Sequence, residues 1–364
     1  MTRRLKLLHV ETGQHLYGGA QQVAYLLDGL AAQGVDNHLV CPPGAAIGAH
    51  FAGSAVTVHP LRCSGDADIG FIRRLARVLR EQQPDLVHLH SRRGADVLGG
   101  IAARWAGVPA VLSRRVDNPE PHWWAQRKYR LYARTVCISE GIADVLRSQG
   151  VDDSRIRVVR SAVDAEPWRH SASRDAFCAE FDVPADALIV GVVAQLIERK
   201  GHRVLFAALR GLPAARQIAL VIFGQGPLRE ALQAESADLP LRALRFAGFR
   251  RDLPRWVGCL DLLVHPALAE GLGVSLLQAS AARVPIIASR AGGMPEAVRD
   301  GLNGVLVAPG DSAALQAAIG RLADDAALRR SLGAAGSQLI DAEFSTAAMV
   351  TGNRAVYDEV LGRG

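Results

Sequence analysis

The sequence lacks several features that define particular classes of protein. No apolar run in its 364 residues approaches the roughly 18 residues that a membrane-spanning helix needs. The five cysteines are scattered and contain no C-x-x-C pair, so they indicate neither a zinc knuckle nor a disulfide framework. Exact repeats, low-complexity tracts and coiled-coil heptads are also missing. With 49% hydrophobic residues, the chain suits two globular domains of about 100–200 residues each.

The N-terminus, MTRRLKLLHVETG, has basic residues and a short apolar run but lacks a small-residue cleavage site. Because Glu11 and Gly13 soon interrupt the run, we interpret it as a first β-strand and not as a signal peptide. We therefore expect a cytoplasmic protein whose cysteines are reduced, small, buried residues.

Lysine is scarce, since only Lys6, Lys128 and Lys200 occur among the 42 basic residues. The net charge of +6 comes from the first half: residues 1–165 hold 21 basic and 15 acidic residues, and residues 166–364 hold 21 of each. Such asymmetry suggests attraction to a phosphorylated partner or an anionic membrane face. An arginine-rich genome is the alternative explanation. A nucleic-acid binder is disfavoured because no RNA- or DNA-binding module accompanies the charge.

Strand-like and helix-like segments alternate along both halves of the chain, which predicts parallel sheets flanked by helices. A connector without a clear strand signal, residues 164–184, separates the halves, and residues 346–364 read as a terminal helix. In the first half, strands are expected at 5–11, 37–43, 85–91 and 109–115, with helices at 18–34, 66–83 and 94–107, and the segments 129–139 and 154–164 continue the alternation. In the second half, strands are expected at 187–195, 218–226, 244–249, 260–267, 284–290 and 304–310.

The most informative segment runs from Glu270 to Val298. It contains an acidic residue, a Gly-x-Gly turn, an apolar stretch and a second turn at Gly292 and Gly293. Glycine lets the backbone approach a ligand closely, and a helix that starts there directs free N–H groups at anionic atoms. The order strand, acidic turn, helix, strand therefore predicts a site for an anionic ligand. An acidic residue that only complements the helix dipole is the alternative.

This segment resembles the nucleotide-sugar signature of the retaining family 4 glycosyltransferases, in which two glutamates are separated by seven residues. Gln278 stands at the second position, where the family's Glu binds the ribose hydroxyls. The resemblance implies that Glu270 hydrogen-bonds the donor sugar and that the backbone of Gly271, Leu272, Gly273 and Val274 also contacts the donor. It also implies the GT-B fold, with two Rossmann-like, doubly wound domains that face a cleft.

The segment VGVVAQLIERKGH resembles the family's strand-end pattern Gly-Arg-Leu-x-x-x-Lys-Gly. Lys200 and Gly201 match it, while Gln195 occupies the Arg position. The resemblance implies that Lys200 and Gln195 contact the donor diphosphate; a solvated loop lysine is the alternative. Because Gln195 and Gln278 remove charges from the expected site, they put donor affinity and activity in doubt.

Further segments resemble family loops at strand ends. Gly18 and Gly19 match a loop that approaches the donor phosphate and the acceptor, although a plain strand-to-helix turn is the alternative. Gly224, Phe249 and Arg250 lie in FGQGPLRE and FAGFRRD, which resemble loops near the nucleotide base.

The sequence DLVHLHSRRG places His88 and His90 on one predicted strand. We expect the two side chains to face opposite sides of the strand, which argues against joint metal ligation. His90 lies nearest the strand's carboxyl end and matches the family's active-site histidine beside the donor sugar, whereas His88 fits a packed core residue better.

Two arginine pairs are expected at neighbouring strand ends, where guanidinium groups can bind phosphate or carboxylate. They are Arg92 with Arg93 and Arg114 with Arg115, and solvated side chains are the alternative. His122, Trp123 and Trp124 could form an apolar lip for a lipid-linked acceptor, although a loop that packs its aromatic residues inward is commoner.

From this resemblance we expect an acceptor-binding domain at 1–165, a nucleotide-sugar domain at 166–345 and a terminal helix at 346–364 that crosses back to the first domain. His90, Lys200 and Glu270 are the expected catalytic residues.

The expected reaction is retaining transfer from a UDP- or GDP-linked sugar to an envelope glycan or glycolipid, with no metal or cofactor. Because no second carboxylate is well placed as a nucleophile, a front-face route is our hypothesis. A peripheral contact with the inner membrane face would accompany a lipid-linked acceptor. A sugar-nucleotide epimerase and a weakly active binding subunit are the alternatives.

Overall fold

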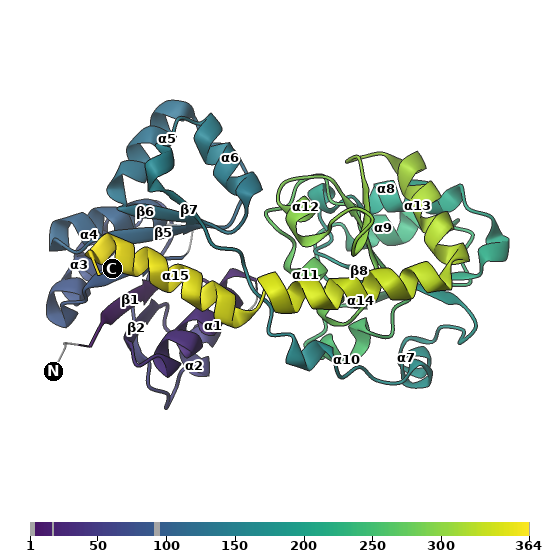
Figure 1. The fold of residues 1–364 in the computed structure, drawn as a ribbon, viewed down its shortest axis with the longest axis horizontal. Helices are drawn as coiled ribbons and strands as arrows, with labels where there is room; N and C mark the ends of the chain where they lie inside the picture. Colours follow the sequence, from purple (N-terminus) through teal and green to yellow (C-terminus); the bar gives the residue numbers. More distant parts are fainter. Residues whose placement is uncertain (1–3, 17, 91–94, 364) are drawn as a thin grey trace. The chain divides into compact units, whose positions relative to one another are not determined.

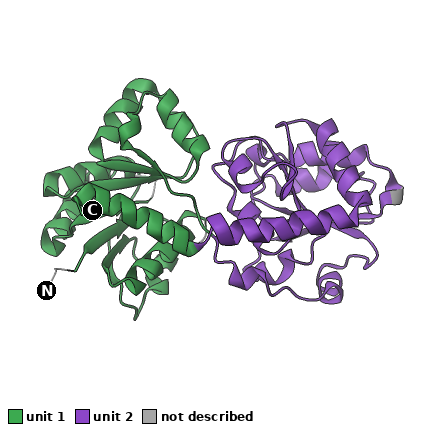
Figure 2. Ribbon diagram, in the orientation of Figure 1, with its two compact units in different colours: residues 1–162, 346–364 green, residues 163–345 purple. Residues whose placement is uncertain are grey.

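The computed structural model describes residues 4–16, 18–90 and 95–363 (Figure 1). The chain divides into two compact units, coloured separately in Figure 2. Unit 1 comprises Met1–Ala162 with Thr346–Gly364, and unit 2 comprises Val163–Ser345. The division therefore lies after Ala162, whereas the sequence analysis set it after residue 165.

A parallel seven-stranded sheet of order β3-β2-β1-β4-β5-β6-β7 forms the centre of unit 1. Its strands are β1 (Lys6–Val10), β2 (Asp36–Cys41), β3 (Thr57–Pro60), β4 (Leu86–Leu89), β5 (Ala110–Arg114), β6 (Arg134–Cys137) and β7 (Ile156–Val158). Strand β3 was not predicted, because at the sheet edge it is exposed at both ends and carries no apolar run.

The helices of unit 1 include one from the end of the chain. They are α1 (Gly19–Ala32), α2 (Ala46–His50), α3 (Gly70–Gln82), the π-helical η1 (Ala95–Gly99), α4 (Gly100–Ala106), α5 (His122–Lys128), α6 (Glu140–Ser148) and α15 (Thr346–Leu361), with short 3-10 turns η2 (Tyr129–Leu131) and η3 (Asp153–Arg155). Helix α15 packs on α1, where Gly29 leaves room for the side chain of Val350. The terminal helix is thereby part of unit 1 (Figure 2).

Unit 2 contains a parallel six-stranded sheet of order β10-β9-β8-β11-β12-β13. Its strands are β8 (Leu188–Val193), β9 (Ile218–Phe223), β10 (Ala243–Gly248), β11 (Leu262–His265), β12 (Ile286–Ser289) and β13 (Gly304–Val307). The helices are α7 (Arg174–Phe181), α8 (His202–Arg210), α9 (Arg229–Glu235), α10 (Pro254–Val257), α11 (Val274–Ala281), α12 (Met294–Ala297), α13 (Ser312–Asp324) and α14 (Ala326–Glu343), with 3-10 turns η4 (Glu166–Trp168), η5 (Glu198–Lys200) and η6 (Ala214–Arg216).

Burial on both sheet faces explains the sequence of the strands. Every residue of β9, IALVIF, is buried, as expected for a parallel strand covered by helices on both sides. Helix α3 instead buries Phe71, Ile72, Leu75 and Leu79, whose spacing makes one apolar face. The two sheets confirm the predicted doubly wound α/β fold, and each predicted strand segment contains a strand.

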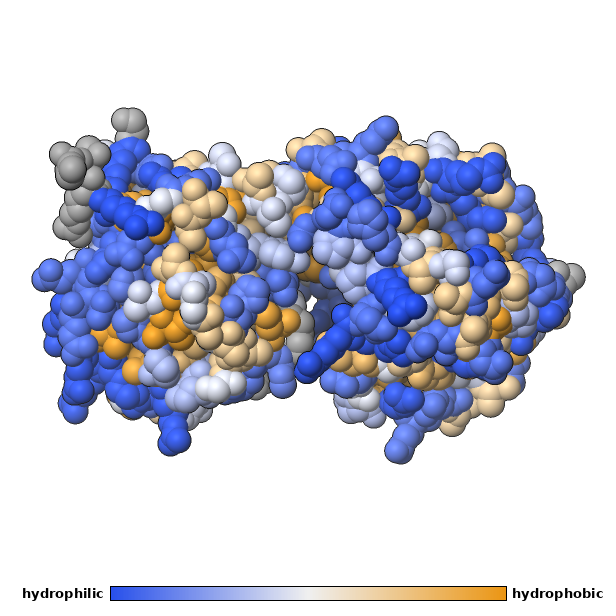
Figure 3. Space-filling view, turned by 90° about the horizontal axis from the view of Figure 1, so that it is seen from below, coloured by the Kyte–Doolittle hydropathy of each residue, from blue (hydrophilic) through white to orange (hydrophobic). Residues whose placement is uncertain are grey.

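The surface of the molecule is mixed. Hydrophilic side chains dominate the face in Figure 3, with hydrophobic ones interspersed. Among the helices that the structure describes, none combines the length and the hydropathy needed to cross a membrane. All five cysteines are free: Cys41, Cys137 and Cys259 are buried, and Cys63 and Cys178 are half-buried.

Candidate active site

In unit 2, the predicted donor residues lie at the carboxyl ends of neighbouring strands. The order β10-β9-β8-β11 places the segments after these strands side by side. Gln195 follows β8, Gly224 follows β9, Phe249 and Arg250 follow β10, and Glu270 follows β11. Open α/β sheets bind ligands at this edge. The fold therefore gathers residues that are up to 75 positions apart in the sequence, from 195 to 270.

An ion pair joins Lys200 to Glu270 at the centre of this edge. Lys200 Nζ donates to Glu270 Oε2, and the two side chains are only 9% and 14% exposed. His265 Nε2 lies 3.3 Å from the same oxygen. Burial alone would raise the pKa of Glu270, but the His265 hydrogen bond and the Lys200 charge outweigh it and hold the pKa well below its usual range. Glu270 is therefore a carboxylate, and Lys200 is not a solvated loop residue.

Gly201 allows the two loops that carry this pair to meet. Its φ is +69°, and a Cβ there would lie 1.9 Å from the carbonyl oxygen of Pro266. Next to it, the Leu268 N–H donates to the Arg199 carbonyl over 2.8 Å. A side chain at Gly201 would separate these loops, and with them Lys200 and Glu270.

Helix α11 begins directly after the Glu270 turn. Gly273 precedes it in the left-handed conformation, with φ +86°, and the Gly271 N–H donates to Glu270 Oε1 over 3.2 Å. The Gly293 N–H donates to the Glu270 carbonyl over 3.1 Å, which links the second glycine turn to the first. Gln278 lies half-buried on α11. This arrangement presents a carboxylate and a helix N-terminus at one sheet edge.

The remaining predicted residues of unit 2 have different surroundings. Gln195 and Phe249 are exposed, while Gly224 has φ +141° and approaches the Ala194 carbonyl too closely for a Cβ. Arg250 forms ion pairs of 2.7 Å with Glu180 and with Asp252. Two carboxylates of unit 2 thus already hold the Arg250 guanidinium.

Unit 1 contains a pocket of about 520 Å³ at the carboxyl ends of its central strands. The segment after β1, the start of α1 and the ends of β4 and β5 contribute to its wall. The lining includes Glu11, Gly19, His90, Arg114 and Arg115. Gly18, which adopts φ +55°, precedes α1, and a Cβ on Gly19 would lie 3.3 Å from Arg115 Cδ.

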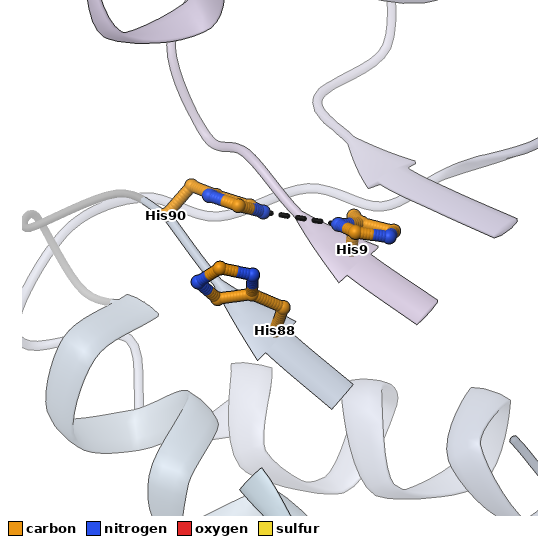
Figure 4. A group of neighbouring side chains, drawn as sticks. All are labelled: His9, His88 and His90. Carbon is orange, nitrogen blue, oxygen red and sulfur yellow. Dashed lines mark hydrogen bonds between the residues drawn. The ribbon is translucent and has the colours of Figure 1, made fainter. Parts of the chain in front are cut away.

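The expectation that His88 and His90 face opposite sides of their strand is wrong. Residues two positions apart point to the same face of a strand, and the two imidazole rings lie 3.9 Å apart between centroids. His9 joins them from the neighbouring strand β1, with its Nδ1 3.0 Å from His90 Nε2 (Figure 4). Both His88 and His90 are buried, as is His9, and burial lowers the pKa of all three, that of His9 to about 3.

The arginine pairs can be located only in part, because Arg92 and Arg93 lie outside the described residues. Arg114 is buried, donates to the Asn118 carbonyl over 2.6 Å and lies 3.8 Å from Glu120. Arg115 is half-buried, and burial lowers its pKa against the opposing charge of Glu11. The pocket thus has a cationic wall.

Lys128, Asp96 and Glu120 form a buried network that the sequence analysis missed. Lys128 Nζ donates to Asp96 Oδ2 over 2.5 Å and to Glu120 Oε1 over 2.8 Å. Asp96 and Lys128 line the same pocket as His90. The scarcity of lysine was the available signal, and it applied to Lys128 as much as to Lys200.

Two other residues also escaped prediction. His9 lies on β1 and is the register partner of His88 on β4. His265 ends β11, five positions before Glu270. The aromatic segment differs too: it is the start of helix α5 instead of a loop, with Trp123 62% exposed and Trp124 half-buried.

Comparisons with known proteins agree with this architecture. Residues 173–339 match the family described as "Glycosyl transferases group 1", and residues 17–167 match "Glycosyltransferase Family 4". The lipopolysaccharide core biosynthesis glycosyltransferase LpsD of Rhizobium meliloti is 28% identical over 99% of this chain and 100% of its own. The GDP-mannose-dependent alpha-mannosyltransferase of Corynebacterium glutamicum is 31% identical over 80% of this chain and 73% of its own.

The fold has close counterparts among solved structures. Anabaena HepE, solved in complex with UDP, superimposes with a TM-score of 0.84 at 19% identity and covers 98% of this chain and 100% of its own. Two Rossmann-like units, the glycine turns at their strand ends and these matches lead to one assignment. The chain belongs to the group 1 glycosyltransferases of family 4, which have the GT-B fold.

Proposed function

We propose that the protein transfers a sugar from a nucleotide-sugar donor bound at the strand ends of unit 2. The observation that carries this proposal is the buried Lys200–Glu270 pair beside the glycine-led start of α11. A diphosphate needs cationic groups and free N–H groups, and sugar hydroxyls need a carboxylate. The Corynebacterium relative is named for GDP-mannose, and HepE was solved with UDP, so both support a UDP- or GDP-linked donor.

In this proposal, Lys200 and the amides at the start of α11 stabilise the negative charge that develops on the departing diphosphate. Glu270, kept ionised by His265 and Lys200, accepts hydrogen bonds from the donor hydroxyls. Transfer needs no metal for this step. The configuration at the anomeric carbon is retained by a front-face route: the leaving phosphate takes the proton of the acceptor hydroxyl as the new glycosidic bond forms.

The acceptor is proposed to be an anionic envelope glycan or glycolipid that binds the pocket of unit 1. Arg115 on the pocket wall is the residue best suited to a phosphate or carboxylate group, since Arg114 is already engaged by Asn118 and Glu120. The name of the Rhizobium relative, which refers to lipopolysaccharide core biosynthesis, supports this class of acceptor. Replacing Arg115 with Gln is expected to raise the acceptor KM at least tenfold and to leave donor affinity unchanged.

We also propose that transfer takes place in the cytoplasm, at the inner face of the membrane. The excess charge of +6 lies in residues 1–165, where Trp123 is 62% exposed on α5 with Arg127 5.8 Å from its ring. Cosedimentation with phosphatidylglycerol vesicles tests the contact. Binding that weakens as salt increases is expected, and absent or salt-insensitive binding would overturn the membrane part of the proposal.

A thermal-shift panel of nucleotide sugars tests the donor site, because a ligand that binds only the native state raises the melting temperature. One donor is expected to stabilise the wild type and Arg216→Ala but not Lys200→Ala. Arg216 is a suitable control because it pairs with Asp324 at the end of α13, away from the Lys200 loop. A flat response to every donor would count against a donor site in unit 2.

Product analysis separates transfer from the two rival activities. NMR of the product is expected to show the anomeric configuration of the donor, whereas inversion would refute the retaining route. Turnover of the nucleotide sugar without acceptor would indicate an epimerase. Donor binding without turnover, unchanged by Gln278→Glu, would indicate a binding subunit.

A further inference from the structure

The three buried histidines of unit 1 meet because of strand geometry. His9 and His88 are register partners on the adjacent parallel strands β1 and β4, and His90 points to the same face two positions further along. One ring nitrogen of each histidine lies within 4.8 Å of the others (Figure 4). Side chains from two rigid strands hold this group, which the function proposed above leaves unexplained.

Their hydrogen bonding is incomplete. His9 Nδ1 and His90 Nε2 face each other over 3.0 Å, but the outer nitrogen of His90, Nδ1, is buried without a hydrogen-bond partner among the described residues. A neutral imidazole has one N–H and one lone pair, so the His90 ring leaves one of these groups unsatisfied, at a cost of about 1–3 kcal/mol.

We propose that His9, His88 and His90 form a binding site for a late first-row divalent metal ion of the Zn²⁺ type. Imidazole nitrogen is a preferred ligand of Zn²⁺, Cu²⁺ and Ni²⁺. With Zn–N bonds of about 2.0–2.1 Å, tetrahedral ligand nitrogens lie about 3.3 Å apart. The His9–His90 separation of 3.0 Å is therefore close to that of a ligand pair, and the His88 nitrogen needs to approach only modestly.

Groups around the cluster can orient the ligands as outer-shell partners do in known metal sites. His88 is bonded through Nδ1 to Tyr357 Oη over 2.6 Å and through Nε2 to Ser113 Oγ over 2.9 Å. Coordination exchanges one of these bonds for the metal and keeps the other to fix the ring. The side chain of Asn37, also buried, is placed to accept the outer N–H of His9 and to orient that ring.

Three histidine ligands leave the fourth tetrahedral position open. Because His90 lines the pocket of unit 1, water or a small ligand from that pocket can fill this position. The leaving-group step described above is assigned to Lys200 and the start of α11, so the proposal gives the metal no part in it.

Titration of the tag-free, chelator-treated protein with Zn²⁺ and with Co²⁺ tests the proposal. The wild type is expected to bind one equivalent of Zn²⁺ and to give the visible absorption of tetrahedral Co²⁺. His9→Gln and His90→Gln are expected to weaken Zn²⁺ affinity more than about 100-fold, beyond the 10–100-fold loss typical of an outer-shell partner.

The chain supplies a matched control in a second histidine pair. His38 Nδ1 and His59 Nε2 lie 2.8 Å apart in stacked rings between β2 and β3, but among the described residues no third histidine completes a triad there. His59→Gln should therefore leave affinity unchanged. Equal losses in His59→Gln and His90→Gln, or no bound Zn²⁺ in the wild type, would overturn the proposal. X-ray absorption of the zinc-loaded wild type gives a readout that needs no variant: fewer than three imidazole ligands would also overturn it.

Discussion

Two of the three lysines in this chain are buried, one in each unit, yet their surroundings differ. Lys128 in unit 1 donates to both Asp96 and Glu120, and Glu120 is itself held by the hydroxyl of Tyr129 over 3.0 Å. Lys200 in unit 2 pairs with the single carboxylate of Glu270, between glycine-rich loops. Lys128 is held by two carboxylates, whereas the ion pair of Lys200 is with one, in a loop that contacts the segment before Glu270. In our proposal, Lys128 stabilises the fold and Lys200 binds the anionic part of the donor.

The largest difference between the two lysines is expected when each is replaced with Met. Both variants leave buried carboxylates without their cation, so each should lose about 3–5 kcal/mol of unfolding free energy. Only Lys200→Met should also weaken donor binding, by at least about 30-fold, since truncating a buried charge partner costs 2 kcal/mol or more. Denaturant unfolding and calorimetric donor titration measure the two effects. Equal donor affinities in the two variants would contradict the assignment of roles.

Two glycines sharpen the same contrast: Gly18 precedes α1 in unit 1, and Gly201 precedes α8 in unit 2. A Cβ at Gly201 would meet the Pro266 carbonyl at 1.9 Å, whereas at Gly18 nothing lies within 4 Å and only the φ of +55° resists a side chain. Gly18→Ala should therefore cost about 1–2 kcal/mol of stability. Gly201→Ala should raise the donor KM more than tenfold, because it displaces Lys200 from Glu270. Steady-state kinetics beside thermal unfolding tests this, and an unchanged KM in Gly201→Ala would argue against the importance of that loop contact.

The features predicted correctly from the sequence share a local signal. Continuous apolar runs marked the buried strands, and the glycine turns after them marked the strand ends that hold Lys200 and Glu270. Each of these signals is local in the sequence. Lys200 and Glu270 meet because the parallel order β8-β11 brings their two loops together. Fold class and this part of the site were therefore accessible.

The features that were missed depend on partners distant in sequence. Nothing near His9 indicates that it faces His90, because that contact requires the register of β1 against β4. Arg250 looked free for a ligand, yet Glu180, 70 positions away, pairs with it. The error over His88 and His90 was different: the period of a strand alone places both on one face, so correct use of that period would have revealed the cluster.

Stability on acidification should also differ between the units. The pKa of a buried histidine is lower in the folded than in the unfolded protein, so the unfolded chain binds more protons below about pH 6.5 and unfolding becomes easier as pH falls. The histidines with lowered pKa are His9, His38, His59, His88 and His90 in unit 1, and His202 and His265 in unit 2.

For His9 this window extends from about 6.5 down to about 3, with a loss of up to about 1.4 kcal/mol per pH unit. Glu270, whose pKa is depressed, adds its own loss only below about pH 4.5. Hydrogen exchange resolved by peptide at pH 7.5 and 5.5 should show unit 1 losing protection first. Earlier loss in unit 2, once rates are corrected for intrinsic exchange, would contradict this order.

The smallest expected effect concerns the donor site of unit 2 alone. Gln278 lies half-buried on α11, at the position where the family's Glu binds the ribose, and a neutral amide accepts a weaker hydrogen bond than a carboxylate. Gln278→Glu should strengthen donor binding by about 1 kcal/mol, or roughly fivefold. Gln233→Glu on the exposed face of α9 adds the same charge to the same unit and should change nothing. Calorimetric titration with the donor compares them. If both variants bind the donor as tightly as the wild type, the ribose is held by other groups and the amide at 278 costs the enzyme no affinity. If both variants bind it more weakly, the added negative charge in unit 2 acts at long range on the diphosphate.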